Sequence, residues 1–203
     1  MTATLLLARH GRTVWHGENR YAGVSDVALT DEGRRQAEAL GAWAGRHPVD
    51  AIWTSTVSRA TETAEPACRV LGLQPRREHE LRECDFGVVE GRTLAEFAAK
   101  DPEAAEAFRT DPVAHPFPDA EDPRAAAARG SGALRRIAGA HEGERVLVVA
   151  HNTLLRLVLC ELLGIPLRDY RRVFPQLRNA AITEIRLAGD GGPAALLGLN
   201  LPC

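Results

Sequence analysis

Histidine, arginine and carboxylate side chains recur where predicted strands of this sequence end. Arg9 and His10 follow the first apolar run, and Arg59 lies at the start of the helix after the second. His151 comes directly after the third run, and Glu83 lies between them in the segment LRECDFGVVEG. Ligands collect at the carboxyl ends of strands in open α/β sheets. We therefore expect these five side chains to meet at one edge of a sheet.

Such a group has the composition that phosphoryl transfer requires. A neutral imidazole can attack phosphorus and form a labile phosphoramidate that water then cleaves. Guanidinium groups bind phosphate oxygens with paired hydrogen bonds and keep their charge. The pKa of a carboxylic acid near a phosphate dianion is raised, so that it can protonate a leaving alkoxide. The pattern predicts an anion site with a nucleophile and an acid.

Each of these residues alone also has a structural interpretation. A single histidine after a strand is more often a hydrogen-bonded core residue than a nucleophile. Arg59 could form a salt bridge at a helix start, and Glu83 could be a loop carboxylate, in which case Asp85 would be the acid. The structural interpretation weakens for the set, because several unrelated charged groups would have to reach one sheet edge by chance.

The elements that must position these side chains alternate between strands and helices. This order predicts an α/β fold, a three-layer sandwich with a mainly parallel central sheet flanked by helices. A helical and loop insertion at about residues 92–123, rich in proline after residue 110, is expected to cap the site. The expected strands are 3–8, 51–53, 145–150, 180–187 and 194–199, and the expected helices are 30–44, 58–71, 93–110 (interrupted at Pro102), 124–140 and 153–163.

The bulk properties restrict the class of protein. A length of 203 residues fits a single domain covering 1–203, and a formal net charge of −2 argues against a nucleic-acid partner. Four widely spaced cysteines without a C-x-x-C pair give no metal site. The N-terminus lacks a signal-peptide pattern, and no run approaches the roughly 20 apolar residues of a membrane span. We expect a cytoplasmic protein without membrane contact.

Four blocks of the sequence resemble those of the histidine phosphatase superfamily, which includes the phosphoglycerate mutase-like proteins. The blocks occur in the order typical of the family and span residues 4–156. They read LLLARHGRTVWHGENRYAGVSDVALTDEGRRQAEALG, TSTVSRATETA, LRECDFGVVEG and VLVVAHNTLLR.

The resemblance implies a role for each matching residue. His10 is implied to be the nucleophile and Glu83 the proton donor. Arg9, Arg59 and His151 are implied to bind phosphate, with His151 also in the catalytic set. The family's fold is an α/β sandwich with a capping insertion, and its chemistry requires no metal; for hydrolysis by this protein we expect no cofactor. Homodimers are common in this family, so a homodimer is a further expectation.

Several positions near the predicted pocket bear on the substrate. Arg12 and His16 stand where the family commonly has Glu or Gln and Asn, so each adds a candidate cation for a second anionic group. Asn19 matches a family position at the entrance, and with His16 it is a candidate phosphate contact. The remaining candidates for specificity are Gly23, Asn152, which stands where many phosphatases of the family have Gly, and Glu121, which lies in the divergent FPDAED segment.

The resemblance leaves three functions open. The expected one is hydrolysis of a small-molecule phosphate ester, because the chain lacks the longer insertion and polar C-terminal tail that mutases of this family usually carry. The alternatives are a cofactor-dependent phosphoglycerate-type mutase and a non-catalytic protein that binds a phosphorylated ligand. Dependence on a bisphosphorylated primer would separate a mutase from a phosphatase.

Overall fold

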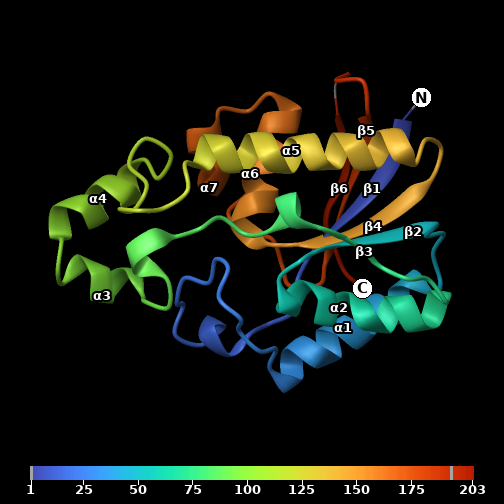
Figure 1. The fold of residues 1–203 in the computed structure, drawn as a ribbon, viewed down its shortest axis with the longest axis horizontal. Coiled ribbons are helices and arrows are strands. Elements are labelled where there is room, and N and C mark those ends of the chain that lie inside the picture. The colour runs from blue at the N-terminus through green and yellow to red at the C-terminus, as the bar shows by residue number, and fades with distance from the viewer. Residues whose placement is uncertain (1, 193) are drawn as a thin grey trace.

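A six-stranded mixed sheet forms the centre of the protein (Figure 1). The computed structural model describes residues 2–192 and 194–203. The strand order is β3-β2-β4-β1-β5-β6; β3, β2, β4 and β1 run parallel, whereas β5 and β6 are antiparallel to their neighbours. The strands are β1 (Thr2–Arg9), β2 (Ala51–Ser55), β3 (Arg76–Glu78), β4 (Arg145–Ala150), β5 (Ile182–Ala188) and β6 (Ala195–Leu201).

Helices cover both faces of this sheet, so the predicted α/β sandwich is confirmed. In β1, Leu5 and Leu7 belong to the core beneath α5 and α6, whereas Leu6 and Ala8 belong to the core beneath α1 and α2. This alternation is the period of two that a strand buried on both faces produces. The helices are α1 (Asp31–Ala44), α2 (Ser58–Leu71), α3 (Leu94–Ala98), α4 (Pro102–Thr110), α5 (Pro123–Ala140), α6 (Asn152–Leu163) and α7 (Tyr170–Val173).

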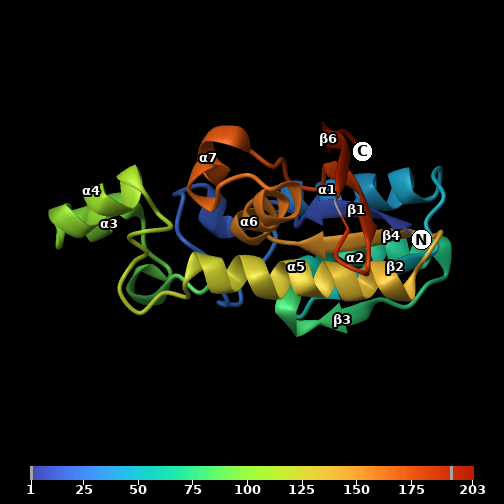
Figure 2. The same cartoon turned by 90° about the horizontal axis from the view of Figure 1, so that it is seen from above.

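The segment between β3 and α5 extends away from the sheet. Figures 1 and 2 both show α3 and α4 projecting at one end of the molecule. An aromatic cluster anchors them: the rings of Phe108 and Phe117 stack with centroids 3.7 Å apart, and Tyr21 lies 5.0 Å from Phe86. Pro102 occupies the first turn of α4, where the missing N–H costs no hydrogen bond. The expected interruption at Pro102 is therefore the start of a second helix.

One short strand and one short α-helix were not predicted from the sequence. The strand β3 reads Arg-Arg-Glu, and its polar composition lacks the apolar signal of a buried strand because it lies at the edge of the sheet. The helix α7 has only four residues, too few to show helical periodicity.

Glycines bring the start of α1 against the loop that follows β1. Thr30 caps α1 by accepting a hydrogen bond from the Gly33 backbone N–H at 3.0 Å, and its own N–H donates to the Arg12 carbonyl at 2.9 Å. A Cβ on Gly33 would lie 2.1 Å from that carbonyl oxygen, and one on Gly11 would lie 2.5 Å from the Gly33 oxygen. The backbone after His10 is thus fixed by contacts that only glycine permits.

Within the described residues, no helix is long and apolar enough to cross a membrane. The same part of the chain holds no cluster of three or more His, Cys, Asp or Glu side chains suited to a metal ion.

We predict that Gly33→Ala lowers the free energy of unfolding by about 2 kcal/mol or more, because the new methyl group collides with backbone that cannot move away. The control is Gly132→Ala on α5, where the nearest atom to a new Cβ is the end of Arg136 at 3.6 Å. That change is expected to stabilise by up to about 1 kcal/mol. Urea unfolding measures both, and equal effects of the two changes would contradict this account.

Candidate active site

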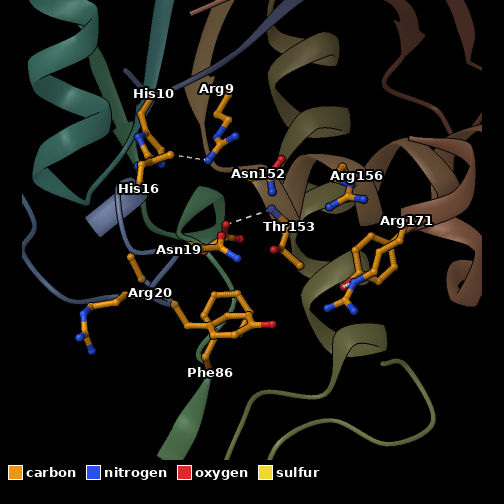
Figure 3. A pocket seen from close by; sticks show the side chains of 14 residues that line it. Arg9, His10, His16, Asn19, Arg20, Phe86, Asn152, Thr153, Arg156 and Arg171 are labelled. Atoms are coloured by element: carbon orange, nitrogen blue, oxygen red, sulfur yellow. Dashed lines mark hydrogen bonds between the residues drawn. The ribbon is translucent and has the colours of Figure 1, made fainter. Parts of the chain in front are cut away.

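A cavity of about 230 Å³ opens at the carboxyl ends of β1 and β4 (Figure 3). Its walls come from the loop after β1, the segment around Glu83, the first turns of α6 and the helix α7. Residues lining it are Arg9, His10, His16, Asn19, Arg20, Tyr21, Ala22, Glu83, Phe86, Asn152, Thr153, Arg156, Tyr170 and Arg171.

His10 is held in a defined tautomer. Its ring is 4% exposed, and Nδ1 lies 2.8 Å from the carbonyl oxygen of Gly11, which can only accept a hydrogen bond. Nδ1 therefore carries the proton, and Nε2 keeps its lone pair, which accepts from Arg59 Nε at 3.2 Å. Burial, followed by the charges of Arg59 and Arg9, holds the pKa of His10 well below its usual range. The ring is neutral at physiological pH, and Nε2 is the nitrogen that carries the lone pair.

Arg59 connects His10 to the loop that covers it. The side chain is 1% exposed, and its remaining donors reach the carbonyl oxygens of Ser25 at 3.0 Å, Ala22 at 3.0 Å and Gly23 at 2.7 Å. Burial lowers its pKa, and the Glu83 carboxylate acts in the opposite direction. Since four of its five N–H groups are engaged, Arg59 both fixes the loop and directs its Nε–H toward Nε2 of His10.

His151 lies beside His10, with ring centroids 5.2 Å apart. Its Nε2 is 2.8 Å from the hydroxyl of Ser55 at the end of β2, whereas Nδ1 is buried without a hydrogen-bond partner. Burial and the charge of Arg59 hold its pKa well below the usual range. An unpartnered buried nitrogen is costly in a folded protein, and it points to a group that is bound in the functional state.

Arg9 and His16 form a pair next to His10; the centroids of the His10 and His16 rings are 5.8 Å apart. Arg9 Nη2 lies 2.5 Å from His16 Nε2, and Nη1 donates to the Leu177 carbonyl at 3.1 Å. Because Arg9 donates, Nε2 of His16 is the acceptor. Burial and the charge of Arg9 lower the pKa of His16 to about 4, and burial lowers that of Arg9 to about 10. His16 is therefore a neutral support for Arg9 and adds no cation to the site, contrary to expectation.

Glu83 receives three backbone N–H groups. Cys84 and Leu154 donate to Oε1 at 3.0 and 2.8 Å, and Thr153 donates to Oε2 at 3.0 Å. The last two groups belong to the first turn of α6, where free N–H groups and the helix dipole favour an anion. Asp85, the alternative acid, is exposed, does not line the cavity, and accepts from Gly87 N–H instead.

Glu121 lies outside the cavity, so the structure contradicts its expected contact with substrate. Both of its oxygens accept from Arg129, at 2.6 and 2.8 Å. Arg129 also donates to the carbonyl oxygens of Glu80 at 2.6 Å, Arg82 at 2.9 Å and Glu83 at 3.2 Å. The pair thus holds the backbone that presents Glu83.

The other specificity candidates divide into two groups. Asn19 and Asn152 line the cavity as expected. Arg12 is exposed and lies outside it, and Gly23 contributes backbone only, accepting from Arg59 and donating to Glu90. The expected second cation at residue 12 is therefore absent from the lining.

Sequence reasoning missed several residues of the site, on the loop after β1, around Glu83, on α6 and α7, and before β5. Asn179 donates to the carbonyl oxygen of His10 at 2.7 Å from the chain just before β5. Arg156, Tyr170 and Arg171 line the wall away from His10. Arg156 could have been found, because it follows Asn152 by four residues and so shares its helix face. The short helix α7 gave no comparable signal.

We predict that stability falls as the pH is lowered from 6.5 to 5. The lowered pKa values of His10, His16 and His151 mean that the unfolded chain binds protons that the folded protein does not. Each such proton lowers the free energy of unfolding by up to about 1.4 kcal/mol for each pH unit below the ordinary histidine pKa. Urea unfolding at several pH values gives the slope of the free energy of unfolding against pH, which reports how many more protons the unfolded chain binds. His16→Gln should lower that number by about one. A slope unchanged by the substitution would contradict the assignment of His16.

Comparisons with known proteins agree with this geometry. The family model "Histidine phosphatase superfamily (branch 1)" matches residues 5–200. The probable phosphoglycerate mutase GpmB of Citrobacter koseri is 31% identical over 88% of this chain and 82% of its own, and phosphoserine phosphatase 1 of Hydrogenobacter thermophilus is 29% identical over 98% and 92%.

Solved structures extend this likeness to the whole fold. YhfR of Bacillus stearothermophilus superimposes with a TM-score of 0.91 at 32% identity, covering 99% of this chain and 98% of its own. A mycobacterial glucosyl-3-phosphoglycerate phosphatase gives a TM-score of 0.87 at 26% identity, covering 99% and 100%. The chain belongs to the histidine phosphatase superfamily.

Proposed function

We propose that this protein is a metal-independent phosphomonoesterase that hydrolyses a small phosphorylated metabolite through a phosphohistidine on His10. The observation that carries the proposal is the state of His10, a neutral buried imidazole whose Nε2 lone pair is directed at Arg59 in the cavity. His16 also accepts from an arginine, but His10 lies beside His151, with ring centroids 5.2 Å apart, and its Nε2 is next to Arg59, which gives it a nucleophile's surroundings.

In the first step, the phosphate of the substrate lies among Arg9, Arg59 and His151. Nε2 of His10 attacks phosphorus, the P–N bond forms, and the P–O bond to the alcohol breaks. Glu83 gives its proton to the departing alkoxide, so the alcohol leaves neutral. Negative charge on the substrate favours protonation of a nearby carboxylate before this step.

In the second step, water attacks the phosphohistidine. The carboxylate of Glu83 takes a proton from the water, the P–N bond breaks, and inorganic phosphate leaves with Nε2 of His10 restored. The Nδ1–H bond to Gly11 keeps the ring in one orientation throughout both steps. Charge on the transferring phosphoryl group is balanced by Arg9, Arg59 and the proton donors around them.

The relatives support hydrolysis without naming the substrate. Their names include phosphoserine phosphatase, glucosyl-3-phosphoglycerate phosphatase and putative alpha-ribazole-5'-P phosphatase. A mutase is the second candidate, because relatives named probable phosphoglycerate mutase match the chain equally well in identity.

We predict that the protein releases inorganic phosphate from a panel of phosphomonoesters in EDTA and that His10→Ala abolishes release. The chemical reason is that the nucleophile and all charge compensation come from side chains. Acid-labile, base-stable label on the wild type after rapid quenching would identify the intermediate. Loss of activity in EDTA that added metal restores would overturn the metal-free mechanism. Turnover only with a bisphosphorylated primer would favour the mutase.

A further prediction concerns the proton donor, Glu83. Glu83→Gln should lower the rate with a poor leaving group by about 10²–10⁴, the usual contribution of general acid catalysis. Activity with p-nitrophenyl phosphate should suffer much less, because that leaving group needs no proton. The matched control is Asp85→Asn, a neighbouring exposed carboxylate, which should change neither rate greatly. A larger loss in Asp85→Asn would reassign the proton donor.

A further inference from the structure

The wall of the cavity opposite His10 contains two guanidinium groups that the proposed hydrolysis does not use. Figure 3 shows Arg156 and Arg171 across the pocket from His10 and His16, with Asn152 and Thr153 between. Both arginines line the same cavity as the nucleophile.

Arg156 is a buried cation without a counter-ion. Its side chain projects from α6, the residue is 8% exposed, and Nε is buried without a hydrogen-bond partner. Its guanidinium lies over the ring of Tyr170, 4.9 Å from the centroid. No carboxylate lies within ion-pair distance among the described residues. Burying an uncompensated charge is costly, so the fold retains Arg156 at the expense of stability.

Arg171 is oriented by aromatic contacts. Its guanidinium lies 4.5 Å from the Phe108 centroid and 5.5 Å from that of Tyr170, and Nε donates to the Tyr170 hydroxyl at 3.0 Å. In the part of the chain that the structure describes, it too has no carboxylate partner. Aromatic faces hold a cation in place but supply no anion. Arg171 also hydrogen-bonds the side chain of Tyr21, which supplies no anion either, so the charge of Arg171 is left for a ligand.

Within the described residues, the remaining charges of the cavity form no ion pair with these two, although the Glu83 carboxylate favours the charged form of Arg156 from a distance. The Glu83 carboxylate accepts three backbone N–H groups, and Arg20 is paired with Glu18 and Glu96 at 2.6 and 2.9 Å. A phosphate ester held by Arg9 and Arg59 would leave Arg156 and Arg171 unpaired.

We infer that the substrate carries a second anionic group, a carboxylate or a second phosphate, which Arg156 and Arg171 bind while the scissile phosphate lies at His10. The inference rests on the proposed function for the position of that phosphate. It places the second-anion contact on α6 and α7, whereas the sequence suggested Arg12 and His16. The cavity of about 230 Å³ is smaller than the roughly 300–1,000 Å³ of drug-sized pockets, which favours a compact metabolite.

The test compares substrates that differ only in the second group. O-Phosphoserine and O-phosphoethanolamine differ by one carboxylate, and propanediol bisphosphate and propyl phosphate differ by one phosphate. In at least one pair, the wild type should favour the compound with the second anionic group. The expected ratio of kcat/KM is about tenfold or more, mainly through KM. The pair that responds identifies the anion. A ratio near one in both pairs would overturn the inference.

Substitutions then assign the effect to the two residues. Arg156→Met and Arg171→Met should each lower the preference about tenfold by removing a charge-assisted contact. The matched control is Arg172→Met; this neighbour of Arg171 has a 74% exposed side chain paired with Asp169 at 3.2 Å. The control should keep the wild-type ratio. Wild-type ratios in both test variants would refute the assignment.

Binding to the His10→Ala protein separates this inference from the proposed function. Calorimetry with O-phosphoserine and O-phosphoethanolamine measures the carboxylate contact without turnover, and the bisphosphate pair does the same for phosphate. Stronger binding of an anionic member, lost in His10→Ala combined with Arg156→Met, supports the second site even if the wild type hydrolyses nothing. Equal binding within both pairs refutes it even if hydrolysis is observed. Inhibition by inorganic vanadate reports whether the phosphate contacts of each active variant remain intact.

Discussion

The buried guanidinium of Arg59 is the interaction on which the site depends. It joins three segments far apart in the chain: the start of α2, the end of β1 through His10, and the loop at residues 22–25. Burial, together with its positive charge, keeps His10 unprotonated, the state that the proposed attack on phosphorus requires. The same hydrogen bonds that stabilise the loop thus set the chemical state of the residue below it.

A second layer of hydrogen bonds supports the residues around this centre. Asn179 holds the His10 backbone, Ser55 holds the His151 ring, and Arg129 holds the carbonyl groups on either side of Glu83. These supports come from different elements of the sheet and from α5. The catalytic geometry is therefore a property of the folded sandwich rather than of any one motif.

Much of the fold and the phosphate end of the site could be predicted, because both follow from strong local patterns. Apolar runs that end in Arg9-His10 and His151 give the strands and their polar ends together, and Gly72 ends α2 in the left-handed conformation that glycine favours. The wrong predictions concern side chains whose positions are set by contacts with residues distant in the sequence. Arg12 is exposed outside the cavity, where the backbone around it docks on the start of α1. Glu121 is bound by Arg129, which lies eight residues later in the chain, in α5.

The substrate end of the cavity was harder to read for the same reason. Arg171 acquires its orientation from Phe108 in α4 and Tyr170 in α7, and neither contact is encoded by spacing along one element. Whether the chain forms one domain with a cap at 92–123 and whether it pairs with a second copy both stay predictions.

The strand order has a consequence for how the protein is made. β1 and β2 come first among the described strands, yet β4 separates them in the sheet, and the described partners of β1 are β4 and β5. On the ribosome, the apolar β1 must wait for more than half of the chain to emerge before it finds either neighbour. Such long-range pairing slows folding and prolongs exposure of aggregation-prone strands. The strand that leads into His10 therefore stays unpaired in the growing chain until β4, which ends at Ala150, has emerged.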